Sequence, residues 1–261
     1  MTPTAEDLLA RASVTDEVLA LLPDYRALLV VVDGIVPAAG DSGSEALLVA
    51  AEEHARGLLE HTPVDALPHV AAWREAYRAF GAKPQRTRNS LEALTRRAPQ
   101  GLPRVNRLTD VYNAVSVLHQ LPLGGEDLDR YAGPPRLLRA TGTEPFDATA
   151  EGEAVVEHPE PGEVVWTDDA GVTCRRWNWR QARRTQLHDG RRPRRSSSST
   201  RSARWTTTRS PPRPTTSWGT WPRARRSAAG GGCWAPVEAS SGLGEVRPVC
   251  WCLVAAVRAE V

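Results

Sequence analysis

The stretch Gly101–Gly133, GLPRVNRLTDVYNAVSVLHQLPLGGEDLDRYAG, marks the point where the chain changes from helices to strands. Four apolar residues in it recur at the spacing of one helix face: Leu108, Val111, Val115 and Leu118. This helix has to end before Pro122. The pair Gly124-Gly125 then predicts a turn, or a place where the backbone approaches a ligand closely.

Upstream of this stretch, the sequence predicts one strand and several helices. The apolar run Tyr25–Val36 (YRALLVVVDGIV) is typical of a strand buried on both faces. Apolar periodicity and capping residues predict helices over 5–22, over Ser44–Glu60 with Ser42 or Ser44 as cap, over Val70–Phe80, and from Asn89 onward.

Downstream, the pattern predicts short strands over Arg136–Ala140, Glu163–Thr167 and Val172–Trp177, the last two forming a hairpin. Because Trp177 and Trp179 alternate with Asn178, we expect both indole rings on one side of a strand, packed in the core or stacked on a ligand ring. A strand, then helices, then strands predicts an α+β domain.

The composition changes abruptly near residue 190. Residues 1–190 carry a net charge of −8 and residues 191–261 a net charge of +10. From Arg191 to Pro236 there is no aliphatic side chain larger than that of alanine and no acid, so we expect 1–190 to be the folded domain and 191–261 a disordered tail. The tail is interpreted either as a basic, nucleic-acid-binding tail or, the better fit, as the product of a changed reading frame. In the other frame Ser196–Ser199 becomes an apolar strand that precedes an amphipathic helix.

Two basic stretches interrupt the acidic domain. Residues 83–107 hold seven basic residues and one acid, and residues 175–184 hold five arginines and no acid. Together they indicate either recognition of an anion such as RNA phosphate, or two solvated faces. The candidate anion contacts in the first stretch are Lys83, Arg86 and Arg88.

Several classes of protein are disfavoured. The cysteine and histidine spacing suggests no metal site, no disulfide framework and no cofactor. We see no secretory signal and no apolar run of transmembrane length, so we expect a cytoplasmic protein without membrane contact.

A combination of motifs spans the Gly101–Gly133 stretch. In order they are Asn106, Asp110, Asn113, Pro122-Leu123 and Asp127-Leu128-Asp129. This combination resembles the B3/B4 domain of the phenylalanyl-tRNA synthetase β subunit. The flanking segments Ala72–Leu94 and Trp166–Thr185 are similar to stand-alone members of that family, and the resemblance covers roughly residues 20–188.

The resemblance implies a three-layer α+β fold with an unusual β-sandwich, and hydrolysis of the ester of mischarged aminoacyl-tRNA by positioning rather than by a nucleophile. It also implies that a strand and a helix are missing after residue 195. Two departures stand out. A histidine of the synthetase is replaced by Gly124, and its Gly-rich loop is replaced by the segment Arg176–Arg180.

From these observations we expect a tRNA-associated protein, either an editing deacylase acting in trans, a non-catalytic RNA-binding module, or a sensor of free amino acids. Its length leaves no room for a complete synthetase. The candidates to orient the ester or the water are Asn113, Asp110 and Asn178. The candidates for substrate or tRNA binding, besides the basic residues above, are Asn106, Gly124, Gly125, Trp177, Trp179 and Arg180. For Asn106 a helix cap is the commonest role, and Asp110 and Asn113 either order each other or face a pocket.

Overall fold

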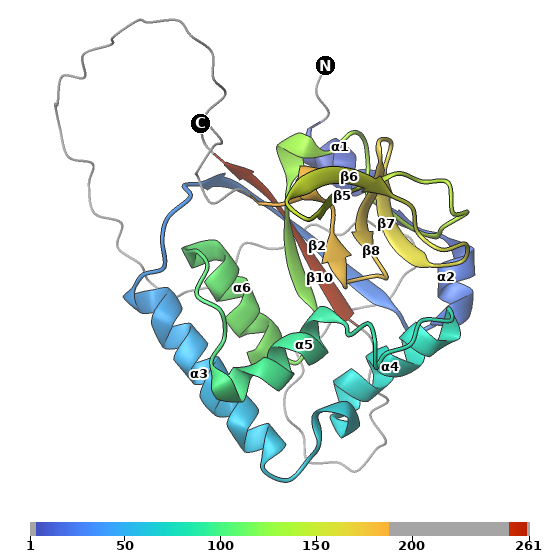
Figure 1. Cartoon of the computed structure of the whole chain (residues 1–261). Coiled ribbons are helices and arrows are strands. Elements are labelled where there is room, and N and C mark those ends of the chain that lie inside the picture. The colour runs from blue at the N-terminus through green and yellow to red at the C-terminus, as the bar shows by residue number, and fades with distance from the viewer. Residues whose placement is uncertain (1–3, 188–250, 260–261) are drawn as a thin grey trace, which may run out of the picture.

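The computed structural model describes residues 4–187 and 251–259 (Figure 1). Its α-helices are α1 (Ala5–Ala10), α2 (Asp16–Leu21), α3 (Ser42–Leu59), α4 (Pro68–Ala79), α5 (Ser90–Arg97) and α6 (Arg107–Leu118). Its 3₁₀ helices are η1 (Val64–Ala66), η2 (Ala98–Gln100), η3 (Leu128–Arg130) and η4 (Arg183–Thr185). Its strands are β1 (Ser13–Val14), β2 (Arg26–Ile35), β3 (Leu123–Asp127), β4 (Arg136–Arg139), β5 (Phe146–Ala150), β6 (Glu153–Glu157), β7 (Val164–Asp168), β8 (Gly171–Arg175), β9 (Arg180–Gln181) and β10 (Trp251–Ala259).

The strands form two sheets, which confirms the α+β class. The larger sheet has the order β1-β4-β7-β8-β5-β6, with β9 paired to β8. The smaller sheet has the order β2-β10-β3, and both of its pairs are parallel. Figure 1 shows the smaller sheet running through the middle of the molecule, with α3, α5 and α6 to one side and the larger sheet to the other.

The main core joins α4 to the larger sheet. Trp73 and Tyr77 of α4 pack with Leu137 of β4, Trp166 of β7 and the buried ring of Trp177. A second core lies among the helices, where Leu48 of α3 packs against Ala114 and Val117 of α6. These two cores hold the helices and the larger sheet in fixed positions around the strands between them.

Most of the expected elements are present, and their caps show how the sequence starts them. The Oδ1 atom of Asn89 accepts a hydrogen bond of 2.9 Å from the backbone N–H of Glu92 and begins α5, as predicted. The predicted serine cap of α3 is wrong. Asp41 takes that role because its carboxylate accepts from the backbone N–H of Ser44 at 2.9 Å, while the Ser44 hydroxyl oxygen accepts from the backbone N–H of Asp41.

The strand β2 confirms the prediction for Tyr25–Val36, but the expectation that both of its faces are buried is wrong. Ala27 and Leu29 pack against the main core. Leu28 and Val32 on the other face stay 41% and 38% exposed. An apolar face of the smaller sheet is therefore left partly uncovered.

The segment for which we expected disorder lies largely outside the described residues, as does the serine run Ser196–Ser199. Within it, residues 251–259 are described as β10, which pairs in parallel with β2 from Trp251↔Arg26 onward and with β3 from Leu253↔Leu123 onward. The strands β2 and β3 are joined through β10. No helix in the described part of the chain has the length and apolar character needed to cross a bilayer.

Candidate functional site

A cavity of about 320 Å³ opens between α5, α6, β3 and the turn that joins β8 to β9. Its aromatic walls are Tyr112, Tyr131, Trp166, Trp177 and Trp179. Its polar side chains are Ser90, Asn113, Glu126, Asn178, Arg180 and Gln181. A volume of this size suits a ligand about as large as an amino acid or its ester.

The turn after β8 shapes one wall of this cavity. The strand ends at Arg175, and Arg176 and Trp177 adopt φ values of 47° and 67°, in the left-handed region that favours glycine. The expected alternation of Trp177 and Trp179 along one strand is therefore wrong, because the backbone reverses between them. Where the resemblance implied a Gly-rich loop, the chain adopts a glycine-like conformation with bulky residues.

Contacts from several elements hold this strained turn in place. Tyr77 donates a hydrogen bond of 2.6 Å to the carbonyl of Arg176, and the backbone N–H of Trp177 donates to the carbonyl of Val164 at 2.8 Å. The carbonyl of Asn178 accepts from the backbone N–H of Ser90 at 3.1 Å. Strain of this kind persists where surrounding contacts over-determine it, and such positions cluster at functional sites.

The two indole rings have separate environments. Trp177 is buried, with its ring centroid 5.1 Å from that of Tyr25 and 5.4 Å from that of Trp73, so most of its surface is core. Trp179 is half-buried and lies against arginines, the nearest being Arg176, whose guanidinium carbon is 4.6 Å from the ring centroid. Of the two rings, Trp179 is therefore the better placed for stacking on a ligand.

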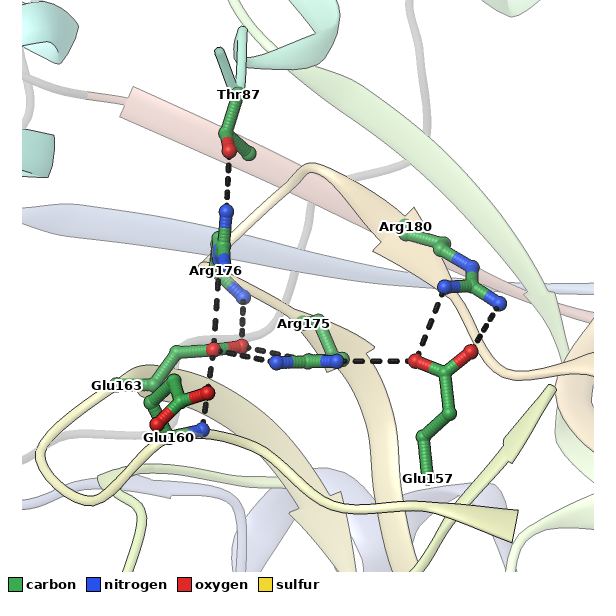
Figure 2. Close-up of polar contacts among 7 residues, drawn as sticks. All are labelled: Thr87, Glu157, Glu160, Glu163, Arg175, Arg176 and Arg180. Carbon is green, nitrogen blue, oxygen red and sulfur yellow. Dashed lines mark hydrogen bonds and ion pairs between the residues drawn. The ribbon is translucent and has the colours of Figure 1, made fainter. Parts of the chain in front are cut away.

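A ladder of ion pairs supports the same turn from the larger sheet. Figure 2 shows it running through Arg180, Glu157, Arg175, Glu163, Arg176 and Thr87, with Glu160 beside it. Arg175 lies 3.1 Å from Glu157 and 2.7 Å from Glu163, and the Glu163 contact raises the pKa of Arg175. Arg180 pairs with Glu157 at 2.9 Å, so its charge is largely balanced where it lines the cavity.

The strand β3 forms the facing wall. Gly124 and Gly125 lie within this strand, so the predicted turn is wrong. A side chain at Gly124 would meet Gln181 at 3.1 Å, and one at Gly125 would meet Leu187 at 2.6 Å and Tyr112 at 3.5 Å. The two glycines therefore let neighbouring elements lie directly against this strand.

Glu126 shares a face of β3 with Gly124 and is 2% exposed. Tyr131 donates a hydrogen bond to its Oε2 atom. Burial raises the pKa of Glu126 from its ordinary value to about 7, against the lowering effect of hydrogen bonds from Tyr131 and Thr173. Sequence reasoning missed Glu126, Tyr112, Tyr131 and Gln181, because a single glutamate or tyrosine carries no local pattern.

Several cavity residues have a polar atom without a hydrogen-bond partner among the described residues. They are the hydroxyl of Ser90, the indole N–H groups of Trp166 and Trp177, and one atom of the Asn178 amide. The Tyr77 hydroxyl lies 2.8 Å from the other terminal atom of the Asn178 amide. Whichever way the amide is flipped, one of its terminal atoms therefore has no partner among the described residues. Buried polar groups without partners are costly, and a ligand that supplies partners removes that cost.

The predicted site residues of α6 divide into two groups. Asn113 lines the cavity, whereas Asn106 caps the helix by accepting from the backbone N–H of Thr109 at 2.9 Å. Asp110 is buried and accepts from the backbone N–H of Val105 at 2.7 Å, which orders the loop before the helix. Asp110 is not among the cavity-lining residues.

The basic residues of the 83–89 segment lie on the surface next to the cavity. Lys83, Arg86 and Arg88 are exposed, and Arg88 lies 3.7 Å from the buried carboxylate of Glu92. The segment leads directly into Ser90, which lines the cavity. Within residues 4–187 and 251–259 no group of three His, Cys, Asp or Glu side chains is arranged to hold a metal ion.

Comparison with known proteins adds one match. No curated protein matches the chain. No solved structure matches it either. Residues 72–191, which contain most of α4 and all of α5, α6, β3 and the turn after β8, match the family model of the B3/4 domain. The B3/4 domain is associated with tRNA synthetases, and the segment that builds this cavity is therefore consistent with a B3/B4 domain that has a tRNA-related role.

Proposed function

We propose that this protein hydrolyses the ester bond of mischarged aminoacyl-tRNA in trans, as a stand-alone relative of the B3/B4 domain of the phenylalanyl-tRNA synthetase β subunit. The observation that carries the proposal is the amino-acid-sized cavity, lined by polar groups without partners, inside the segment that matches the B3/4 domain. We place this activity in the cytoplasm, where aminoacyl-tRNA is found.

The chemistry proposed is attack by water on the ester carbonyl carbon. The water oxygen forms the new bond, the bond from that carbon to the terminal ribose oxygen breaks, and the ribose oxygen takes up the proton that the water gives up. Asn113 and Asn178 are the amides best placed to orient the ester or the water. No histidine lines the cavity in the described part of the chain, so positioning and hydrogen bonding supply the catalysis.

The exposed Lys83, Arg86 and Arg88 support a surface for the tRNA backbone. Their segment continues into Ser90 at the cavity wall, so a phosphate held there would lie close to an ester in the cavity. The second candidate, tRNA binding without hydrolysis, is favoured by the absence of a histidine at Gly124 and rests on the same basic segment.

The test is single-turnover deacylation of tyrosyl-, phenylalanyl- and related aminoacyl-tRNAs. Asn113→Ala and Asn178→Ala should slow release by about 10²–10³-fold, the usual cost of losing one orienting hydrogen bond. Asp127→Asn, a conservative change on the opposite face of β3, is the control and should be neutral. Release no faster than the spontaneous rate, with tRNA still bound, would reject hydrolysis and leave the binding module.

We further propose that the reading frame changes near residue 190. The support is the composition break and the partly uncovered apolar face of β2, where Leu28 and Val32 stay exposed. A restored frame would supply the helix that the resemblance implies, and its strand would take the place that β10 holds in the present chain. The nucleotide sequence around codons 185–195 tests this, and a uniform frame there, shared by relatives with the same Arg/Ser/Trp composition, would refute it.

A further inference from the structure

The cavity contains a buried carboxylate that differs from the other buried glutamates of the described chain. Glu52, Glu92 and Glu163 each form an ion pair with an arginine, at 3.8 Å to Arg56, 2.8 Å to Arg74 and 2.7 Å to Arg175. Glu126 is just as buried but forms no ion pair with any described basic side chain.

The nearest candidate partner for Glu126 is already occupied. Arg184 acts on the Glu126 carboxylate by charge alone, because its two guanidinium nitrogens lie 2.6 Å and 2.8 Å from the Asp168 carboxylate oxygens. Tyr131 offers Glu126 only a neutral hydroxyl. An unpaired buried carboxylate is costly to keep, and groups of this kind are concentrated at functional sites.

From this pairing pattern we propose that Glu126 is the receptor for the ammonium group of the cavity's ligand. The inference rests on the proposed function, because it assigns one contact to the free α-amino group of the aminoacyl ester. The cavity's neutral donors at Ser90, Trp166 and Trp177 remain for the oxygen atoms of the same ligand. The aromatic rings of Tyr112 and Tyr131, which also line the cavity, add a second attraction for a cation.

The proposal predicts whether the affinity for a cationic ligand rises or falls with pH. In the empty cavity Glu126 holds its proton up to about neutral pH, so a cationic ligand binds more tightly as the pH rises toward about 6.5, a range in which the ligand's own ammonium group stays charged. If Glu126 instead donated a hydrogen bond as a neutral acid, affinity would fall over the same range.

The groups around Glu126 that bear on this dependence are Tyr131, Asp168, Arg184, Tyr112, Cys174 and Arg180. Burial raises the pKa of both tyrosines, so neither titrates below neutral pH. An ordinary thiol also titrates above pH 8.

The experiment compares two kinds of ligand, with and without an amino group, on two versions of the full chain. The ligands are the methyl esters of L-alanine, L-valine, L-phenylalanine and L-tyrosine, each paired with the same ester lacking the amino group. The proteins are the wild type and Glu126→Gln, which keeps the shape and an oxygen that accepts from Tyr131. Asp127→Asn, one residue along on the opposite face of β3, is the matched control.

For at least one side chain, the amino ester should bind the wild type at least about tenfold more tightly than its desamino partner. Glu126→Gln should abolish that ratio and leave desamino binding unchanged, and Asp127→Asn should keep it. Wild-type affinity for the amino ester should rise between about pH 5.5 and 6.5, where the ester's ammonium group stays charged, and this tests the proposal without any variant.

Three results would overturn the inference. The first is equal binding of the amino and desamino esters to the wild type, and the second is an equal loss of affinity for both in Glu126→Gln. The third is no binding of any amino ester at 10 mM, roughly the weakest affinity expected of so small a ligand. If one of these results is obtained while the protein still deacylates tRNA, only the role of Glu126 is rejected. An ammonium preference without deacylation or tRNA binding would keep the role of Glu126 and reject the proposed function in favour of an amino-acid sensor.

Discussion

The hydroxyl of Tyr77 donates a hydrogen bond of 2.6 Å to the main-chain carbonyl of Arg176, 99 residues further along the chain. Tyr77 belongs to α4 in the helical layer, and Arg176 begins the left-handed turn that walls the cavity. A helix on one side of the core therefore sets the backbone geometry on the other. The same hydroxyl lies 2.8 Å from the Asn178 amide, so it also orients a candidate site residue.

Tyr77→Phe should loosen this turn while keeping the ring in the core. The free energy of unfolding should fall by about 1–3 kcal/mol, because a buried carbonyl loses its partner. Urea unfolding measures this, and deacylation should slow with it if Asn178 orients the ester. The control, for stability alone, is Tyr112→Phe, which changes a cavity-lining tyrosine outside the turn. Unchanged stability would show that the turn holds itself.

The raised pKa of Glu126 should make stability depend on pH. Between its ordinary value of 4.5 and about 7, the folded protein keeps a proton that the unfolded chain has lost. The free energy of unfolding should therefore fall as pH rises through this window, by roughly 3 kcal/mol in full. Glu126→Gln should remove this pH-dependent part of the free energy of unfolding. The difference in that free energy between wild type and variant, measured in urea, should therefore change with pH between 4.5 and 8. A constant difference would contradict the burial of this carboxyl.

The strand β10 should be required for the smaller sheet. It pairs with β2 on one side and β3 on the other, so each backbone N–H in its middle serves one of these neighbours. Ala255→Pro removes one of these donors and should strongly destabilise the protein, whereas Ala255→Ser keeps it and should be tolerated. Thermal unfolding compares the two. Equal melting temperatures would show that β2 and β3 do not depend on this strand.

The basic segment should contribute to tRNA affinity through phosphate contacts. Reversal of Arg86 and Arg88 to Glu, or Lys83→Ala, should weaken binding and flatten its salt dependence by about one unit of slope per lost phosphate contact. Arg11→Glu, an exposed reversal directly after α1, is the control. Filter binding of tRNA tests this between 50 and 200 mM salt, a range over which counterion release has a large effect on affinity. An unchanged slope of affinity against salt concentration would show that the segment is only a solvated face.

Much of the local structure follows from the sequence alone. The helix over Val70–Phe80, the cap at Asn89, the strand over Tyr25–Val36 and the hairpin formed by β7 and β8 are all where the pattern predicts them. Each depends on residues a few positions apart, so the information is local. The hairpin of β5 and β6 is not predicted, because β5 alternates mainly between small residues and β6 does not alternate.

The candidate site was predicted only in part. Asn113, Asn178 and Gly124 were singled out and line one cavity, whereas Asn106 and Asp110 serve the start of α6. Gly124-Gly125 read as a turn because two adjacent glycines usually make one. The pairing of β3 with β10 overrides that preference.

The sequence by itself determined the α+β class, the helix faces, the cap at Asn89 and the change in composition near residue 190, because periodicity, capping and composition act over short distances. Only the tertiary structure decided that α5, α6, β3 and the turn after β8 enclose one cavity, that Trp177 enters the core with a positive φ, and that Glu126 lies buried without an ion pair to any described side chain. Burial and charge pairing depend on which distant segments meet. No spacing along the chain encodes the cost of an unpaired carboxylate, since that cost arises only when packing removes water from it.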